Sequence, residues 1–240
     1  MTEWLSRTHL LLGDDGLNKL KNSSVLIVGL GGVGAYAAEM ICRAGTGKMT
    51  IVDGDTIQPS NRNRQLLALN STEGDAKASL MGNRLMDINP DLDLELINEY
   101  IKDDRMKEIL DGGFDYLVDA IDTLSPKVFL LYHAVMKKNP VVSSMGAGGK
   151  FNPERISVGD ISETTDCPLA RILRKRLHRL GIRNGVTAVY SPEVIDKSKV
   201  QPAPGERNKA SVVGTISYMP AAFGIACASV VIRDLAGIPR

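Results

Sequence analysis

The stretch that decides the fold reads Val25-Leu26-Ile27-Val28-Gly29-Leu30-Gly31-Gly32-Val33-Gly34. It opens with an apolar run, which is typical of a short parallel strand buried on both faces. Gly29, Gly31 and Gly34 then match the pattern G-x-G-x-x-G at the start of a helix predicted over 33–44. Glycines there let the backbone turn tightly and approach phosphate oxygens, and a helix N-terminus favours negative charge. The stretch therefore predicts a strand–turn–helix unit that binds a nucleotide.

Outward from this unit, apolar strand patterns alternate with amphipathic helix patterns. Strands are expected at 25–28, 49–52, 92–100, 116–118 and 141–144, and helices at 33–44, 75–88, 104–110 and 126–138. This βαβ alternation predicts a Rossmann-like, doubly wound α/β fold. Its sheet should be mostly parallel, with ligands at the carboxyl ends of the strands.

The pattern changes after residue 150. The remaining chain is expected to form a strand at 155–160, a helix at 168–180, a strand at 185–190, a long loop over 191–211 and an apolar helix within 212–232. Polar and small residues dilute that last stretch, so we interpret it as a buried or interface helix and expect no membrane span. The fold should therefore be a single domain, with a nucleotide-binding part at 1–150 and a C-terminal mixed extension at 151–240.

Composition limits the classes of partner. Hydrophobic residues make up 43% of the 240 residues and charged residues 24%, which is ordinary for a soluble globular protein. The net charge is only +1, so any contact with nucleic acid must come from a local basic patch. The cysteines, Cys42, Cys167 and Cys227, form no C-x-x-C pair. This argues against a disulfide framework and a cysteine-bound structural zinc, predicts packed thiols, and fits a cytoplasmic location.

Polar residues after the second strand narrow the chemistry. Asp53 ends that strand, where a carboxylate could accept hydrogen bonds from ribose, but this feature fits an NAD-dependent dehydrogenase equally well. Arg64 and Lys77 favour cleavage of a triphosphate, because cations stabilise the charge that develops on pyrophosphate. Asp122, just beyond the fourth strand, could hold Mg²⁺ through its oxygen atoms.

Motifs in a fixed order carry a more specific resemblance, running from about residue 6 to residue 149. They are G-x-G-G-x-G (Gly29, Gly31, Gly32, Gly34), D-x-D (Asp53, Asp55), N-x-x-R-Q (Asn61, Arg64, Gln65), Lys77 and D-A-I-D (119–122). Together they resemble the ThiF/MoeB/HesA family, bacterial relatives of ubiquitin-activating enzymes. The resemblance implies an adenylating domain over 1–240 that activates a substrate carboxylate with Mg²⁺ and ATP and releases pyrophosphate.

The resemblance also implies roles for single residues. Gly29, Gly31, Gly32, Gly34, Asp53, Asp55 and Gln65 would bind the nucleotide, with Asp53 on the ribose; Asn61, Arg64 and Lys77 would contact phosphates; Asp122 would bind Mg²⁺. Arg7 matches an arginine that dimers of this family lend to the ATP of the partner subunit, so a homodimer is implied.

Some of these residues also allow an interpretation without a functional role. Arg62 is interpreted as solvated, Asp55 could only cap a turn, and Asp119 could be structural while Asp122 acts.

Later segments resemble one branch of the family, which dehydrates the threonylcarbamoyl group on a tRNA adenosine. They are 61–69, the turn 146–149, Asp160-Ile161 and Pro168-Leu169-Ala170. In that branch ring closure needs no enzyme nucleophile, which agrees with the absent C-x-x-C pairs. Some members have a cysteine before the final helix, whereas this chain has none over 206–211. Two alternatives remain open: an adenylyltransferase for a ubiquitin-like sulfur-carrier protein, with a sulfur-transfer partner, and a binding module that senses nucleotide.

A tRNA substrate requires positive charge, and the segment 171–183 supplies it. At helical spacing, Leu169, Leu173, Leu177 and Leu180 should face the core, while Arg171, Arg174, Lys175, His178 and Arg179 should face outward. A solvated helix face would have the same pattern. Combined with the family resemblance, the pattern predicts that Arg171, Arg174, Lys175 and Arg179 contact tRNA phosphates.

Overall fold

The computed structural model describes residues 3–202 and 211–239. Its main feature is a seven-stranded sheet in the order β3-β2-β1-β4-β5-β7-β6. The strands are β1 Ser24–Val28, β2 Lys48–Val52, β3 Asp93–Ile97, β4 Tyr116–Asp119, β5 Val141–Ser144, β6 Ser157–Asp160 and β7 Thr187–Tyr190. All neighbouring strands are parallel except β6, which runs antiparallel to β7. This confirms the predicted doubly wound, mostly parallel fold, and β6 and β7 join the later segments to the same sheet.

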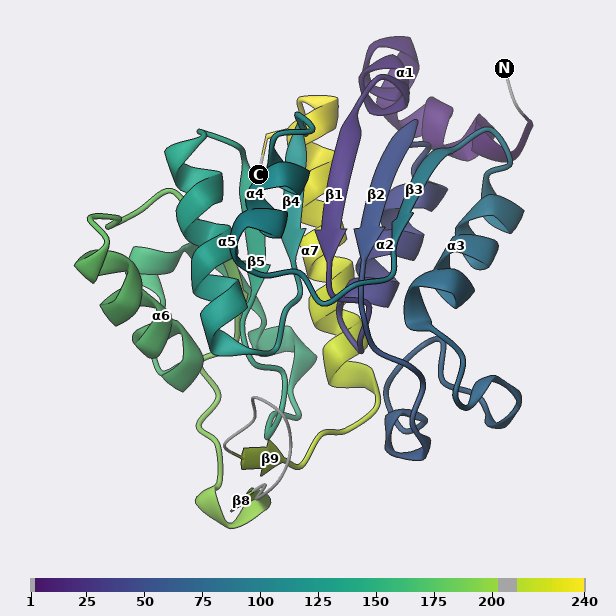
Figure 1. The fold of residues 1–240 in the computed structure, drawn as a ribbon. Coiled ribbons are helices and arrows are strands. Elements are labelled where there is room, and N and C mark those ends of the chain that lie inside the picture. The colour runs from purple at the N-terminus through teal and green to yellow at the C-terminus, as the bar shows by residue number, and fades with distance from the viewer. Residues whose placement is uncertain (1–2, 203–210, 240) are drawn as a thin grey trace.

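Helices cover both faces of the sheet (Figure 1). One face carries α2 Gly34–Arg43, α3 Lys77–Ile88 and α7 Tyr218–Ala236; the other carries α4 Asp103–Leu110, α5 Leu124–Met136 and α6 Pro168–Arg179. Short 3-10 helices occur at Glu3–Leu5, Pro59–Asn61, Asn70–Thr72, Pro153–Arg155, Ile161–Glu163 and Lys197–Lys199. Each face has its own buried apolar cluster, so β1, β2, β4 and β5 lie between two layers of packed side chains.

The last helix is α7, and its apolar character comes from burial. It is long and apolar enough to cross a membrane by length and composition, but half of its most apolar window is buried inside the protein. Met219, Phe223 and Cys227 are fully buried, and the helix packs on α2, β4, β5 and β7. The prediction of a buried helix is therefore confirmed. It begins at Tyr218 rather than near 212, because Ser211–Val213 forms strand β9.

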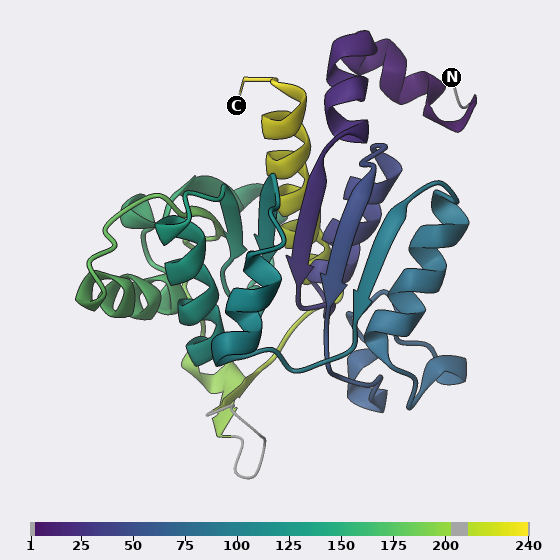
Figure 2. The same cartoon turned by 45° about the horizontal axis from the view of Figure 1, so that its top comes forward.

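The loop predicted over 191–211 is wrong in part. Strand β8, Val200–Pro202, pairs antiparallel with β9, while residues 203–210 lie outside the described residues, as do most of the 206–211 positions compared above. Figure 2 shows this hairpin beyond the carboxyl ends of the central strands. The predicted strand at 92–100 is also too long. β3 is the sheet edge, and only Asp93–Ile97 pairs with β2.

A helix that the sequence analysis did not predict, α1 Ser6–Lys21, precedes β1. It is interrupted at Gly13, where φ is 69° and the backbone leaves the helical region. α1 packs on α7 and lies beyond the amino ends of the strands, opposite the β8–β9 hairpin (Figure 1). The two ends of the sheet therefore carry different structures.

Candidate nucleotide site

The turn after β1 has no space for side chains. Gly29 has a φ of 93°, and a Cβ atom there would lie 2.7 Å from the carbonyl oxygen of Ala120. A Cβ atom on Gly34 would lie 1.7 Å from the carbonyl oxygen of Gly29. Both glycines are therefore required by the turn itself, in which β1, the first residues of α2 and the end of β4 come together. This close approach of backbone leaves N–H groups available to an anion.

Gly31 and Gln65 lie on the open side of this turn. A Cβ atom on Gly31 would meet only the Nε2 atom of Gln65, at 3.7 Å. The Oε1 atom of the same Gln65 side chain is buried and has no hydrogen-bond partner within the described part of the chain. A buried acceptor without a partner is uncommon and costs free energy. Its position beside the glycine turn fits a site completed by a ligand that donates a hydrogen bond.

Asp53, at the end of β2, connects the two loops of the site. One carboxylate oxygen accepts a hydrogen bond from the backbone N–H of Leu30 at 2.6 Å, and the other accepts one from the N–H of Asp55 at 2.8 Å. Burial raises the pKa of the Asp53 carboxyl above its ordinary value, although the charge of Lys77 and both backbone hydrogen bonds act against this rise. Asp53 therefore stabilises the D-x-D turn and keeps a carboxylate close to the glycine turn.

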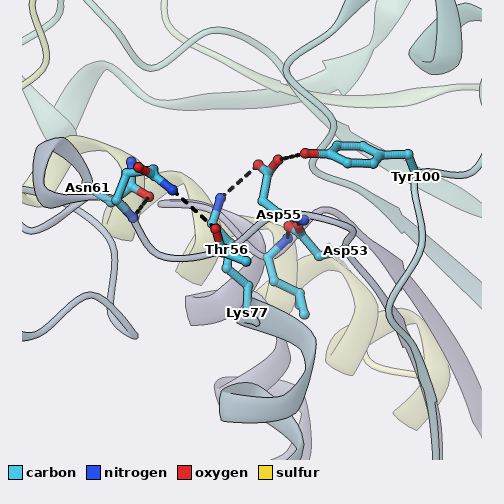
Figure 3. A network of polar contacts seen from close by, with 8 residues as sticks. Asp53, Asp55, Thr56, Asn61, Lys77 and Tyr100 are labelled. Atoms are coloured by element: carbon cyan, nitrogen blue, oxygen red, sulfur yellow. Dashed lines mark hydrogen bonds and ion pairs between the residues drawn. The ribbon is translucent and has the colours of Figure 1, made fainter. Parts of the chain in front are cut away.

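Lys77 and Asp55 form the central ion pair of the polar network in Figure 3, with Nζ 2.8 Å from Oδ2. Lys77 begins α3 and is only 5% exposed, so its ammonium depends on this partner. The hydroxyl group of Tyr100 donates a hydrogen bond to the other oxygen of Asp55. The Tyr100 backbone also packs on Gly54, where a Cβ atom would lie 2.5 Å from the Tyr100 nitrogen. Sequence reasoning missed Tyr100, because a lone tyrosine after an edge strand carries no motif.

Asn61 and Arg64 follow on the 3-10 turn after β2. Asn61 is buried, and its side-chain oxygen accepts a hydrogen bond from the backbone N–H of Gln58 at 3.1 Å. The Nη1 atom of Arg64 donates to the Asn63 side-chain oxygen at 2.7 Å and to the carbonyl oxygen of Ser60 at 2.9 Å. These contacts aim the guanidinium without neutralising its charge, which leaves it suited to a phosphate.

Asn63 is a second residue that the sequence analysis did not assign. Its side-chain nitrogen donates to the carbonyl oxygen of Thr215 at 2.9 Å, while its oxygen accepts from Arg64. Asn63 therefore connects the arginine to the chain that follows β9. Arg62, in contrast, is exposed and donates to the Asn70 side chain at 2.8 Å, in agreement with its interpretation as a solvated residue.

The D-A-I-D motif spans the end of β4 and the loop into α5. Asp119 is fully buried and pairs with Lys127, another residue that the sequence analysis did not identify, at 2.8 Å. Asp122 is exposed on the loop just before α5. Among residues 3–202 and 211–239, no cluster of three or more His, Cys, Asp or Glu side chains could hold a metal. A magnesium ion here would rely on Asp122 together with phosphate oxygens and water, which is the usual pattern for Mg²⁺ with nucleotides.

The structure does not bring Arg7 to this group within one subunit. Arg7 is exposed in the first turn of α1, and α1 lies at the opposite end of the sheet (Figure 1). The other predicted nucleotide residues follow β1, β2 and β4 at their carboxyl ends, on both sides of the point where the strand order reverses. Open α/β sheets bind ligands at that point.

Helix α6 presents most of the predicted basic face. Arg171, Lys175 and Arg179 are exposed, while Leu173 and Leu177 are buried as expected. Two expectations are corrected. Leu180, which was expected to face the core, is exposed because the helix ends at Arg179. Arg174 is half-buried, and its guanidinium donates to the carbonyl oxygen of Thr164 at 2.8 Å and to that of Ile161 at 3.2 Å, so it does not face outward.

All three cysteines are free and buried, as predicted. Burial raises the pKa of the Cys42 thiol to about 11 and that of Cys227 to about 12. Thiols with such high pKa values stay protonated near neutral pH and are poor nucleophiles.

Comparison with known proteins adds independent observations. A model of the ThiF family matches residues 5–240. The Bacillus subtilis protein named tRNA threonylcarbamoyladenosine dehydratase is 35% identical over 242 residues, covering 98% of this chain and 95% of that protein. The crystal structure of the Escherichia coli tRNA N6-threonylcarbamoyladenosine dehydratase in complex with ATP superposes with a TM-score of 0.88 at 32% identity, covering 97% of this chain and 93% of that one. The molybdopterin-synthase adenylyltransferase of Salmonella typhimurium is 34% identical over 140 residues, covering 58% of this chain and 56% of that protein.

Proposed function

Because this chain belongs to the ThiF family, we propose that it is an ATP-dependent tRNA threonylcarbamoyladenosine dehydratase. The observation that carries the proposal is the similarity to relatives with that name, which covers the nucleotide-binding part and the C-terminal extension alike. Similarity to the carrier-protein adenylyltransferase covers little more than half of the chain. The whole chain, 1–240, would act as one adenylating domain in the cytoplasm, where tRNA is available.

The reaction has two steps. A carboxylate oxygen of the threonyl group attacks the α-phosphorus of ATP. The bond between this phosphorus and the oxygen that bridges to the β-phosphate breaks, and pyrophosphate leaves. An internal nucleophile of the threonylcarbamoyl group then attacks the acyl carbon and AMP leaves, so the ring closes with net loss of the elements of water. No enzyme nucleophile takes part, which agrees with the burial of all three cysteines. The same burial gives no support to a sulfur-transfer partner.

The polar groups predicted from the sequence would act in the first step. The glycine turn would hold the triphosphate through backbone N–H groups, and Gln65 would use its unpartnered acceptor on the nucleotide. Asp53 would accept hydrogen bonds from ribose, supported on one side by Asp55. Lys77 and Arg64 would stabilise the charge on the leaving pyrophosphate, with Asn61 beside them.

Magnesium fits the donors at the carboxyl end of β4. Asp122 offers a hard oxygen ligand on an exposed loop next to the glycine turn. A bound Mg²⁺ would neutralise charge on the phosphate oxygens during pyrophosphate release. Asp122 would hold that ion, and we assign this role to no other carboxylate.

The position of α1 supports a homodimer. Arg7 lies at the wrong end of the sheet to reach its own nucleotide site, and so would serve the site of the second subunit. Leu10 and Leu11, on the same helix, are both 84% exposed, an unusual exposure for two consecutive leucines. Exposed apolar side chains of this kind are typical of subunit interfaces. The complete active site would therefore contain residues of two chains.

The basic face of α6 would contact the tRNA backbone. Arg171, Lys175 and Arg179 are exposed on one helix and carry the charge that phosphate binding requires. Arg174 is left out of this surface, because backbone carbonyls already occupy its guanidinium.

The test is pyrophosphate release from ATP, measured with bulk tRNA from cells that can or cannot make the threonylcarbamoyl mark. Release with marked tRNA alone is expected. Release with a carrier protein ending in Gly-Gly, and not with marked tRNA, would instead establish the alternative adenylyltransferase. ATP binding without release in either assay would identify a nucleotide-sensing module.

A further inference from the structure

The strongest unexplained feature is the ion pair between Lys127 and Asp119. Both side chains have 0% exposure, and the Nζ and Oδ2 atoms are 2.8 Å apart. Removing two charges from water is costly, and apolar side chains of similar volume often give a protein of equal or greater stability. Stability alone therefore does not account for charges at this position.

The remaining atoms of the pair hold one loop residue. The second oxygen of Asp119 accepts a hydrogen bond from the backbone N–H of Ile121 at 3.1 Å. The Lys127 ammonium donates to the carbonyl oxygen of the same Ile121 at 3.1 Å. The hydroxyl group of Ser143, on β5, donates a hydrogen bond at 2.6 Å to Asp119 Oδ2, the oxygen that also pairs with Lys127. Both backbone polar groups of Ile121 are thus bound to buried, charged side chains.

The loop residue Ile121 lies between Ala120, which contacts the glycine turn, and Asp122. Ala120 is in contact with the glycine turn, since Cβ atoms on Gly29 and Gly34 would lie within 3.0 Å of it. Asp122 follows Ile121 directly, and α5, which begins at Leu124, carries Lys127 in its first turn. A shift of Ile121 would move the wall of the glycine turn and the Asp122 carboxylate together.

We propose that Lys127 and Asp119 are positioning residues that hold the Ile121 backbone and thereby place Asp122 for the nucleotide-bound magnesium. The inference rests on the proposed function, because it gives Asp122 the task of binding that ion. Neither Lys127 nor Asp119 touches ATP in this scheme. They act through the loop, and the effect of losing them should appear first in the loop and in the requirement for Mg²⁺.

The test uses the double variant Asp119→Asn, Lys127→Met, which removes both buried charges and keeps side chains of similar length. We expect it to fold, to exchange amide hydrogens over residues 117–124 at least tenfold faster without ligand, and to need at least tenfold more Mg²⁺ for half-maximal pyrophosphate release. The matched control is Lys137→Met, at the end of the same helix, where the lysine pairs with Asp111 on the surface. The control should leave both measurements unchanged.

A folded double variant with parental exchange and a parental Mg²⁺ requirement overturns the proposal, even if its melting temperature falls. If the double variant does not fold, Ser143→Ala decides, since it removes one support of Asp119 and should shift both measurements about two- to threefold in the same direction. Parental values in Ser143→Ala would then overturn the proposal. If the parent enzyme releases no pyrophosphate with marked tRNA, the proposed function fails, while hydrogen exchange still tests whether the pair holds the loop.

Discussion

The two sides of the nucleotide site differ in how their charged residues are held. At the end of β4, Asp119 and Lys127 are completely enclosed and bind the backbone of one loop residue. In the loop and helix that follow β2, Lys77 pairs with Asp55, whose side chain is 47% exposed. The hydroxyl group of the exposed Tyr100 donates a hydrogen bond to the same carboxylate. A carboxylate that water reaches can leave an ion pair at lower cost than an enclosed one, although the Lys77 side chain is only 6% exposed and needs a partner in either state.

This difference indicates that the β4 side and the β2 side contribute to nucleotide binding in different ways. The β4 side is preorganised before any ligand arrives, so it can fix geometry. The β2 side holds Lys77 on a carboxylate that water already reaches, so the lysine can transfer to a phosphate at small cost. Binding of ATP would then exchange one partner of Lys77 for another while the β4 loop stays in place.

The largest effect should follow from Lys77→Met, which removes the exchangeable cation. We expect kcat for pyrophosphate release to fall about 100- to 1000-fold, the range for losing one group that stabilises transition-state charge, with little change in ATP affinity. Lys48→Met is the matched control, because Lys48 pairs with Asp93 at the start of β2, far from the site. A Lys77→Met enzyme with turnover within threefold of the parent would remove Lys77 from the chemistry.

The second prediction concerns pH and Asp53. Burial raises the pKa of this carboxyl, so on acidification it protonates at a higher pH than an ordinary aspartate, and the acceptor that we propose for ribose would be lost. ATP affinity should therefore fall as pH decreases through the raised pKa. Stability should change in the opposite direction. A raised pKa in the folded state contributes stability at low pH, and this contribution is lost as pH rises through the folded value.

Titration calorimetry with ATP between about pH 4 and pH 7, paired with thermal melts, tests both signs. Asp53→Asn should bind ATP about tenfold more weakly, the cost of about one charge-assisted hydrogen bond, and should lose the pH dependence of affinity. An unchanged pH profile in Asp53→Asn would show that another group is responsible.

The same comparison explains what could be predicted from the sequence. The glycines and Asp53 directly follow predicted strands, so the βαβ pattern was sufficient to bring them together, whereas Lys77 was assigned from the order of the family motifs. Lys127 and Tyr100 could not be found this way, because their partners come from other elements and no local spacing marks them. Asn63 likewise bonds to Thr215, far along the chain.

The fold shows the same limit. Strand β1, which is buried on both faces, produces a continuous apolar run over 25–28 and was predicted closely. α1 was missed because Gly13 interrupts its helical pattern, and the β8–β9 pair because each strand has only three residues and one contains Pro202. Short, exposed elements are determined by tertiary contacts more than by local pattern.

A third, smaller effect separates the residues of α6. Lys175→Gln should weaken binding of marked tRNA a few-fold and reduce the slope of log affinity against log salt by about 1, because one phosphate contact is lost. Arg174→Gln should leave that slope unchanged and lower stability by about 1–3 kcal/mol, since the carbonyl of Thr164 loses the Arg174 donor and that of Ile161 keeps only Thr164. Filter binding across a salt series and chemical denaturation measure the two quantities. If both variants reduced the salt slope equally, Arg174 would belong to the tRNA-binding face of α6.

The smallest effect is expected from Asn63→Ala, which tests whether Asn63 orients the Arg64 guanidinium on the β2 side of the site. Asn63 accepts a hydrogen bond from Arg64 and donates one to Thr215, so its removal leaves the guanidinium charged but less well oriented. We expect the KM for ATP to rise about twofold, which corresponds to about 0.5 kcal/mol, the low end for one hydrogen bond, with kcat nearly unchanged. Asn70→Ala is the matched control, because Asn70 makes the same kind of contact to the solvated Arg62. If both variants behave alike, the Arg64 guanidinium needs no support from the chain after β9, and the β2 side aims its cations without help from the C-terminal extension.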